Sequence, residues 1–558
     1  MQSRYSLTLV AVFIAQAVTM DRPYEMVASA FFILSFCRGE PLYLLTTARQ
    51  RKLESSKLRL CSYLRLKIPR AHPALSKRGL NSQTVNPQAL RALESGDWDS
   101  ALENLERAAM RAGNPAERSK LSLELAGVWA LYGKDGVEGL SAALQDAMLT
   151  QPSVREDALF KALRAASTAF ALEAELVQRP AIDDPRRVRG VELALESLSG
   201  NDEARFHAGA ALVVLGESER SLEVLGGLEL EKLPSYLRWR WHSWRGGALE
   251  DLQRWREAAV SYHAGAMLTE GVDRAALLQD EAAMLLELEE PHAALEVLIQ
   301  AQSAVRDGEN PLDAASRLHL EARAHLQLSN PSLARDRAEE AANLELSVGE
   351  PSFGVALVLG QTLAALEDWR GAIASFASAV QIGTPLDQGF ALHEMGLAQM
   401  DAGLPDESRQ SLMAVLNGAD YPHKPEVQSD LAELEYRLGN FDAAEIHARQ
   451  ALESGATVPA SLMLANIAYE YYRLDEALEH YTRALEDAPE GTRDWVLAHQ
   501  MTADTLVQLA WRDPERILYH ASTALPHLEP SDEWAVTLGG YIERAKTLLA
   551  GSGSRTLN

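Results

Sequence analysis

One short pattern recurs along most of the chain and constrains the fold more than any other feature. It is clearest as GDWDSAL at residues 96–102 and as LDEAL at residues 474–478. Between the copy at Ser221 and the copy at Ala477, the spacings between successive copies are 37, 36, 40, 38, 36, 36 and 33 residues. A period in this range is typical of solenoids built from helical hairpins. We call the small residue on which the nine copies align the anchor; the anchors are Ala101, Ser221, Ala258, Ala294, Ala334, Ala372, Ser408, Ala444 and Ala477.

Two further positions lie at a fixed distance from every anchor, and we call them columns: the first column is twelve residues before the anchor and the last column is seven residues after it. Small residues in the first column and at the anchor allow the two helices of a hairpin to approach closely. The last column lies on the same helix face as the anchor. Twelve residues before each anchor the chain has only Gly or Ala: Ala89, Gly209, Gly246, Ala282, Ala322, Gly360, Gly396, Ala432 and Ala465. Seven residues after each anchor it has Ala108, Leu228, Gly265, Ala301, Ala341, Ala379, Val415, Ala451 and Ala484.

Rings and prolines flank the anchors. Three residues before the anchor the chain has mostly a ring, and we expect it to break the helix or to fill the hairpin turn. These residues are Trp98, Trp255, Pro291, Pro331, Trp369, Pro405, Phe441 and Leu474. Other prolines, among them Pro115, Pro385, Pro422 and Pro489, are expected just after a second helix, where a helix must stop.

These columns resemble the tetratricopeptide repeat family over residues 86–530. The small, aromatic and proline positions of that family are matched by Ala465, Ala477, Tyr481, Ala484 and Pro489, and in the same way by Gly360, Trp369, Ala372, Phe376 and Ala379. The resemblance implies an all-α fold, a right-handed α-α superhelix of about 9–12 helical hairpins.

Two stretches depart from the repeat pattern. Residues 119–187 have helical composition but degenerate columns, and residues 237–252 fit two registers. We expect a capping helix at residues 531–550, because the last repeat has no neighbour, and a flexible tail at residues 551–558. The sequence also predicts an elongated particle, with a radius of gyration above the ~24 Å of a compact globule of this length.

The first 80 residues differ from the rest in charge and in cysteine content. They carry 13 Lys and Arg against four acidic residues, and they contain both cysteines, Cys37 and Cys61. Three interpretations remain open for this segment: upstream sequence included by a start codon assigned too early, a targeting segment, or a genuine extra element. Its apolar runs are shorter than a membrane span. The expected compartment is the cytoplasm, or the cell exterior if residues 1–17 are a signal peptide.

The net charge of the chain narrows the classes of molecule that it is expected to bind. The whole chain has a net charge of −26, and the residues after position 80 carry 40 basic and 75 acidic groups. Such a surface repels phosphate backbones, so we expect no bulk nucleic-acid binding and a preference for basic or neutral proteins. The oligomeric state stays open.

Repeats of this kind bind partners through a groove lined by the first helix of each hairpin. Counting from the columns, we predict a partner-binding groove formed by Arg240, His319, Arg323, Gln361, His393, Tyr436, Asn466 and Tyr469. The phrase RWRWHSWR at residues 238–245 could stack bases or hold an acidic peptide. Helical spacing of Trp241 and Trp244 with Leu237 and Ala248 favours core packing instead.

Motifs for catalysis were not found. The sequence has no zinc-protease helix, no phosphate-binding glycine loop ending in Lys-Ser/Thr, and no Gly-x-Ser-x-Gly elbow. We therefore expect no catalytic residues, no metal site and no cofactor. The predicted function is a protein-interaction scaffold or adaptor; the alternative is a sensing or oligomerisation arm of a complex whose active domain is on another chain.

Overall fold

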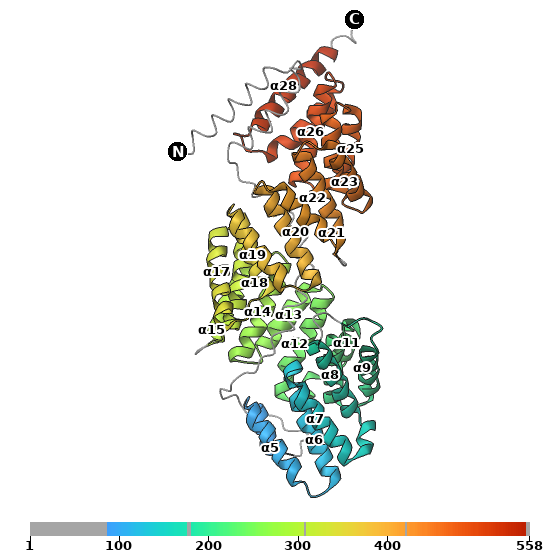
Figure 1. Ribbon diagram of the computed structural model, residues 1–558, viewed down its shortest axis with the longest axis vertical. Helices are drawn as coiled ribbons and strands as arrows, with labels where there is room; N and C mark the ends of the chain where they lie inside the picture. The colour runs from blue at the N-terminus through green and yellow to red at the C-terminus, as the bar shows by residue number, and fades with distance from the viewer. Residues whose placement is uncertain (1–85, 176–179, 306–308, 419–420, 554–558) are drawn as a thin grey trace. The chain divides into compact units, whose positions relative to one another are not determined.

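The computed structural model describes residues 86–175, 180–305, 309–418 and 421–553. Within these ranges it contains 25 α-helices and no strand, so the predicted all-α repeat fold is confirmed. The first 24 of these helices form twelve consecutive pairs, in which most helices pack mainly against their neighbours along the chain (Figure 1); the exception is α10, which contacts α8 more than α9. This number lies within the predicted range of hairpins.

The first helices of the pairs are α4 (Pro87–Glu94), α6 (Pro115–Ala130), α8 (Ala158–Glu175), α10 (Asp202–Val214), α12 (Ser235–Asp251), α14 (Gly271–Glu287), α16 (Pro311–Gln327), α18 (Phe353–Ala365), α20 (Pro385–Asp401), α22 (Lys424–Arg437), α24 (Thr457–Glu470) and α26 (Arg493–Gln508). The second helices are α5 (Trp98–Arg111), α7 (Val137–Thr150), α9 (Pro185–Glu196), α11 (Ser218–Gly226), α13 (Trp255–Ala266), α15 (Pro291–Ala304), α17 (Pro331–Val348), α19 (Trp369–Ile382), α21 (Pro405–Asn417), α23 (Phe441–Glu453), α25 (Leu474–Asp487) and α27 (Pro514–Ala524). The last helix is α28 (Glu533–Gly553). Short 3-10 helices are η3 (Gly133–Gly136), η4 (Pro152–Glu156), η5 (Ser197–Ser199), η6 (Leu230–Lys232) and η7 (Leu525–His527).

The structure explains why the anchor is small. All nine anchors lie on second helices, and the exposed fraction of every one of them is 0%. Two anchors are serines, and each donates a hydrogen bond to the carbonyl of the glycine twelve residues earlier: Ser221 to Gly209 at 2.9 Å and Ser408 to Gly396 at 2.7 Å. The hydroxyl therefore fits a fully buried position because it has a partner there.

The glycines of the first column make room for a large side chain on the second helix. A Cβ atom at Gly360 would lie 2.5 Å from the ring of Phe376, and one at Gly246 would lie 2.5 Å from the ring of Tyr262. In both repeats the ring belongs to the residue four positions after the anchor. Both rings are among the most buried side chains of the described residues. Close helix approach and burial of a ring thus depend on the same glycine.

The ring or proline before the anchor begins the second helix. Trp98, Trp255, Trp369, Phe441 and Leu474 are the first residues of α5, α13, α19, α23 and α25. The prolines of this column likewise begin α15, α17 and α21, where a missing N–H costs nothing. The expectation that these residues break a helix or fill a turn therefore changes: they set where the second helix starts.

A left-handed residue connects the two helices in each of the nine repeats. It stands five residues before the anchor, with φ between 56° and 78°. Four of these residues are glycines, Gly96, Gly216, Gly403 and Gly439. The other five are Gln253, Glu289, Ser329, Glu367 and Tyr472. Because non-glycine residues adopt this conformation at a cost, the tertiary packing of the hairpin imposes it.

Candidate functional site

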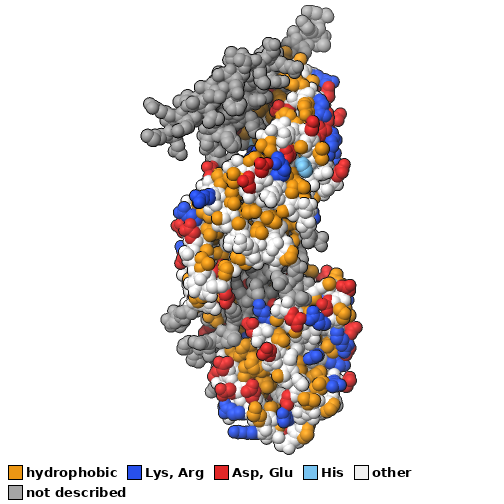
Figure 2. Space-filling model, viewed as in Figure 1, with side chains coloured by type: hydrophobic (Ala, Val, Ile, Leu, Met, Phe, Trp, Pro, Cys, Tyr) orange, Lys and Arg blue, Asp and Glu red, His pale blue; other side chains and the backbone are white. Residues whose placement is uncertain are grey.

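Consecutive first helices contact one another directly along much of the chain. From α14 to α26, each first helix contacts the first helix of the next hairpin, while consecutive second helices do not contact one another to the same extent. The first helices therefore lie on the inner side of the bend between neighbouring hairpins. Side chains on their inner faces are the candidates for contact with a partner. On the face visible in Figure 2, acidic and basic side chains are interspersed.

The eight predicted groove residues all lie on first helices. Arg240 is on α12, His319 and Arg323 on α16, Gln361 on α18, His393 on α20, Tyr436 on α22, and Asn466 and Tyr469 on α24. The first five are buried, with exposed fractions between 1% and 8%, and the last three are half-buried. Most of their surface is therefore already in contact with the protein itself.

Several of these side chains connect one first helix to the next. Arg323 donates to Glu287 at 2.9 Å and Gln361 donates to Glu394 at 2.9 Å. The hydroxyl of Tyr436 donates to Glu470 at 3.2 Å. In each pair the partner lies 33 to 36 residues away, which is one repeat. The predicted groove residues thus also hold neighbouring hairpins in register.

Tyrosines make the same kind of link near the end of the repeats. Tyr469 on α24 and Tyr541 on α28 both donate their hydroxyl to the carboxylate of Asp504 on α26. Asn466, also on α24, accepts a hydrogen bond from Tyr481 within its own hairpin at 2.7 Å. Burial, with the carboxylate of Asp504 second, raises the pKa of Tyr469 above its usual range. The tyrosine hydroxyl therefore stays a donor at neutral pH.

His393 is the centre of a buried three-residue chain. Its Nε2 lies 2.6 Å from Oδ2 of Asp430, and its Nδ1 lies 2.8 Å from the hydroxyl of Tyr421. If Nε2 carries the proton, Nδ1 accepts from the tyrosine and all three groups are satisfied. The three side chains are 1–6% exposed, so the chain connects α20 with α22 and does not face solvent.

The Arg/Trp phrase lies on α12 and packs inward. Leu237 and Ala248 are buried, while Trp241 and Trp244 are half-buried and pack against the same core cluster. Trp241 donates its ring N–H to the carbonyl of Leu225 at 2.9 Å. The third tryptophan, Trp239, is 6% exposed. This geometry matches the core interpretation of the phrase.

Arg240 is the least expected member of this group, because its guanidinium is buried with few hydrogen bonds. Its central carbon lies 4.0 Å from the ring centre of Trp239 and 4.5 Å from that of Trp98. Nη1 donates to the carbonyl of Tyr236 at 2.9 Å, whereas Nε has no hydrogen-bond partner. Desolvation lowers the pKa of Arg240 to about 10. The side chain stays charged at neutral pH.

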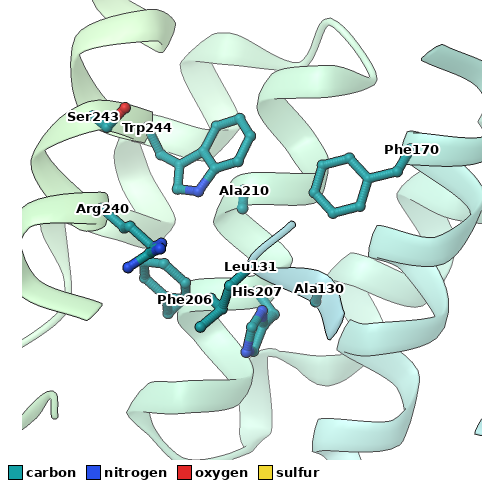
Figure 3. A pocket seen from close by; sticks show the side chains of 9 residues that line it. All are labelled: Ala130, Leu131, Phe170, Phe206, His207, Ala210, Arg240, Ser243 and Trp244. Atoms are coloured by element: carbon teal, nitrogen blue, oxygen red, sulfur yellow. The ribbon is translucent and has the colours of Figure 1, made fainter. Parts of the chain in front are cut away.

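A small cavity adjoins Arg240 (Figure 3). Its volume is about 10 Å³, which is the space of a single water molecule. Apart from Arg240, His207 and Ser243, the lining is apolar and includes Phe170, Phe206 and Trp244. Burial lowers the pKa of His207 to about 3, so the imidazole is neutral. The cavity is too small for an organic ligand.

Two further acidic residues with raised pKa values were not singled out from the sequence. Glu203 on α10 and Asp273 on α14 are half-buried, and burial raises their pKa values to about 7 and about 6. No sequence signal marks them, because isolated carboxylates on helices are usually solvated. The described residues contain no cluster of three or more His, Cys, Asp or Glu side chains placed to hold a metal ion. Nor does any helix in these ranges have the length and apolar character to cross a membrane.

Fold and site together define the described residues as an α-helical repeat array in which buried polar links join successive first helices. A family model described as tetratricopeptide repeat matches residues 393–459 and 430–492. The predicted resemblance to tetratricopeptide repeats is therefore confirmed over residues 393–492.

Comparisons with individual proteins show distant similarity. No curated protein matches the chain. Among solved structures, yeast Tom70 is 14% identical with a TM-score of 0.39, covering 83% of this chain and 95% of that one. A tetratricopeptide repeat protein from Parabacteroides merdae is 16% identical with a TM-score of 0.36, covering 46% and 93%. The apo form of RapI is 10% identical with a TM-score of 0.44, covering 58% and 97%.

Proposed function

We propose that this chain is a non-enzymatic scaffold that binds segments of partner proteins along the inner faces of its first helices. The observation that carries the proposal is the direct contact between consecutive first helices from α14 to α26. It places polar side chains of successive repeats one after another, at a spacing that an extended segment can follow.

The half-buried residues Tyr436, Asn466 and Tyr469 are the accessible part of this surface. Aromatic side chains with a polar end suit protein interfaces, because they bury apolar area and still form a hydrogen bond. The excess of 75 acidic over 40 basic groups after residue 80 favours basic or neutral partners over acidic ones.

The test is capture of partners from native extract by the tagged protein, with bound proteins identified by mass spectrometry. The double variant Arg323→Ala/Tyr469→Ala changes the first helices α16 and α24. The matched variant Arg335→Ala/Tyr519→Ala removes the same residue types from exposed positions on the second helices α17 and α27. Both are checked for helix content by circular dichroism.

We expect the first-helix variant to lose captured proteins that the second-helix variant retains. Equal capture by the two variants, with both folded, would show that the groove assignment is wrong.

A further inference from the structure

Two buried histidines face each other inside the last hairpin. His499 on α26 and His520 on α27 have their Nδ1 atoms 2.7 Å apart and their ring centres 4.9 Å apart. Their exposed fractions are 4% and 8%. At this distance one Nδ1 donates a hydrogen bond and the other accepts it, so a single proton lies between the two nitrogens. The pair therefore joins the first and second helices of the hairpin in one protonation state only.

The surroundings of the pair are aromatic and apolar. Trp495 lies edge-on to His499 with ring centres 4.4 Å apart, and the ring of Tyr519 lies 5.9 Å from that of His499 and 5.0 Å from that of His520. Trp495 also packs against an apolar cluster with members from α26, α27 and α28: Val496, Ala503, Ala521, Ala524 and Leu538. A charged imidazolium is unfavourable in such a place.

Few charged groups act on the two imidazoles. His527 on η7 acts on His499, while Arg516 and Asp513 act on His520. Asp513 is the only acid among these three, and it already accepts the main-chain N–H of Arg516 at 3.1 Å. Among the described residues, none of the charged groups acting on the pair comes from α24, α25 or α28. A second proton on the pair therefore has no counter-charge of its own.

That second proton would place two imidazolium N–H groups against each other. Burial, with the charge of His527 second, lowers the pKa of His499 to about 4. Burial, with His499 and Arg516 next, lowers the pKa of His520 to about 3. Both values lie below the ordinary 6.5. The contribution of the pair to stability is therefore complete above pH 6.5 and is lost as the pH falls below it.

The position of the pair at the end of the array decides what this loss does. Helix α28 packs mainly on α27, and Tyr541 of α28 donates a hydrogen bond to Asp504 of α26. A terminal hairpin has a neighbouring hairpin on one side only, so its opening disrupts the fewest contacts. His207, whose pKa is also lowered, lies on α10 between neighbouring hairpins. Opening in acid is therefore expected first at the last hairpin.

We propose that the His499–His520 pair is an acid-sensitive joint, at which α27 separates from α26 and carries α28 with it when both imidazoles are protonated. The separation gives both rings access to water and removes Tyr541 from Asp504. The joint belongs to the last hairpin and operates whether or not the first helices bind a partner.

The test is hydrogen exchange of the full chain at pH 7 and pH 5, followed by mass spectrometry of peptides and corrected for the intrinsic pH dependence of exchange. Each imidazole changes the ratio of open to closed hairpin by up to about tenfold per pH unit. We therefore expect the protection of α27 and α28 to fall by about a hundredfold. Helices α18 and α19 contain no histidine and are the internal reference, where the fall should be at least tenfold smaller.

The double variant His499→Asn/His520→Asn places amide groups near the positions of the Nδ1 atoms and has no imidazole to titrate there. We expect the protection of its α27 and α28 to change with pH no more than that of α18 and α19. The matched control is His263→Asn on α13, whose side chain is 51% exposed. It should keep the full loss of protection seen in the unmodified chain.

Two results would overturn the proposal. One is a loss of protection in α27 and α28 of the unmodified chain that is no larger than the loss in α18 and α19. The other is an equal loss in the unmodified chain and the double variant, which would assign the effect to other groups of the hairpin, such as Asp504.

A double variant that is already unprotected in α27 at pH 7 leaves the decision to the unmodified chain between pH 6.5 and pH 5. A fall in the protection of α27 steeper than tenfold per pH unit supports the joint, because it requires more than one proton. A fall of tenfold per unit or less overturns it.

Discussion

At the scale of single residues, the hairpin depends on three positions of each repeat. The anchor must be small, the residue twelve positions earlier must leave space for a side chain, and the residue five positions earlier must be left-handed. Each of these requirements predicts the sign of a substitution.

Gly360→Ala should destabilise the protein by about 1–3 kcal/mol, because the new methyl group overlaps the buried ring of Phe376 at 2.5 Å. Thermal and urea denaturation measure the change. The control is Gly539→Ala on α28, where a Cβ meets no atom within 4 Å and helix propensity predicts a gain of up to about 1 kcal/mol. A neutral Gly360 variant would show that the ring does not require the glycine.

Glu367→Gly should stabilise the protein by about 1 kcal/mol, since Glu367 has φ of 59° and glycine adopts this conformation without steric cost. Gly439→Ala, at φ of 75° in the equivalent turn, should lose a similar amount. Glu296→Gly, in the middle of α15, is the matched control and should be destabilising. Melting temperatures that fall for both Glu→Gly variants would contradict the prediction.

At the scale of elements, neighbouring hairpins are held by polar links between first helices as well as by packed cores. These links place charged or hydrogen-bonding groups in buried positions, where each partner depends on the other. The strongest such case is His393 between α20 and α22.

His393→Ala should destabilise the protein by about 2–4 kcal/mol, because it leaves the buried carboxylate of Asp430 and hydroxyl of Tyr421 without this partner. His263→Ala on α13, whose side chain is 51% exposed, should change stability by less than about 0.5 kcal/mol. Equilibrium denaturation of both variants decides the matter; a similar small loss in each would rule out a structural role for the His393 chain.

The contribution of Glu203 to the free energy of unfolding should fall by about 1 kcal/mol between pH 6.5 and pH 8. Its folded pKa is about 7, above the ordinary value of 4.5, so the folded state holds a proton that the unfolded state has lost. Raising the pH through 7 therefore weakens this contribution. The histidines oppose it: burial lowers the pKa values of His207, His499 and His520 to about 3 or 4, so near pH 6.5 the unfolded state binds more protons at these groups than the folded state, and their contribution to stability rises with pH.

The measurement is the melting temperature at the two pH values, with Glu203→Gln as the comparison. The histidine contribution is the same in both chains, so we expect the melting temperature of the unmodified chain relative to that of the variant to be lower at pH 8 than at pH 6.5. A difference between the two chains that does not change with pH would contradict a raised carboxylate pKa.

At the scale of the whole molecule, the twelve hairpins form an array in which each contacts chiefly its neighbours. Stability in such an array is approximately a sum of repeat terms and neighbour terms. A local defect is therefore expected to weaken a local stretch and not the entire chain.

Gly360→Ala should reduce amide hydrogen-exchange protection most in α18 and α19, less in α16, α17, α20 and α21, and hardly in α25 to α28. Exchange followed by mass spectrometry of peptides resolves these segments. A uniform loss of protection in every helix would indicate one cooperative unit in place of a repeat array.

The sequence by itself determined the all-α repeat fold, because small residues at a period of 33 to 40 positions can only be explained by helix pairs that recur. It also placed all eight groove candidates on first helices, since position within a repeat follows from the columns. These conclusions need only local spacing and side-chain size.

Only the tertiary structure decided what those residues contact. Five of the nine left-handed turns were hidden because their residues are not glycine. The partners of Gln361 and Tyr436 lie one repeat away, and repeat length varies too much for the pairing to be counted in advance. Trp98 packs on α12 across more than a hundred residues, a contact that no local pattern encodes.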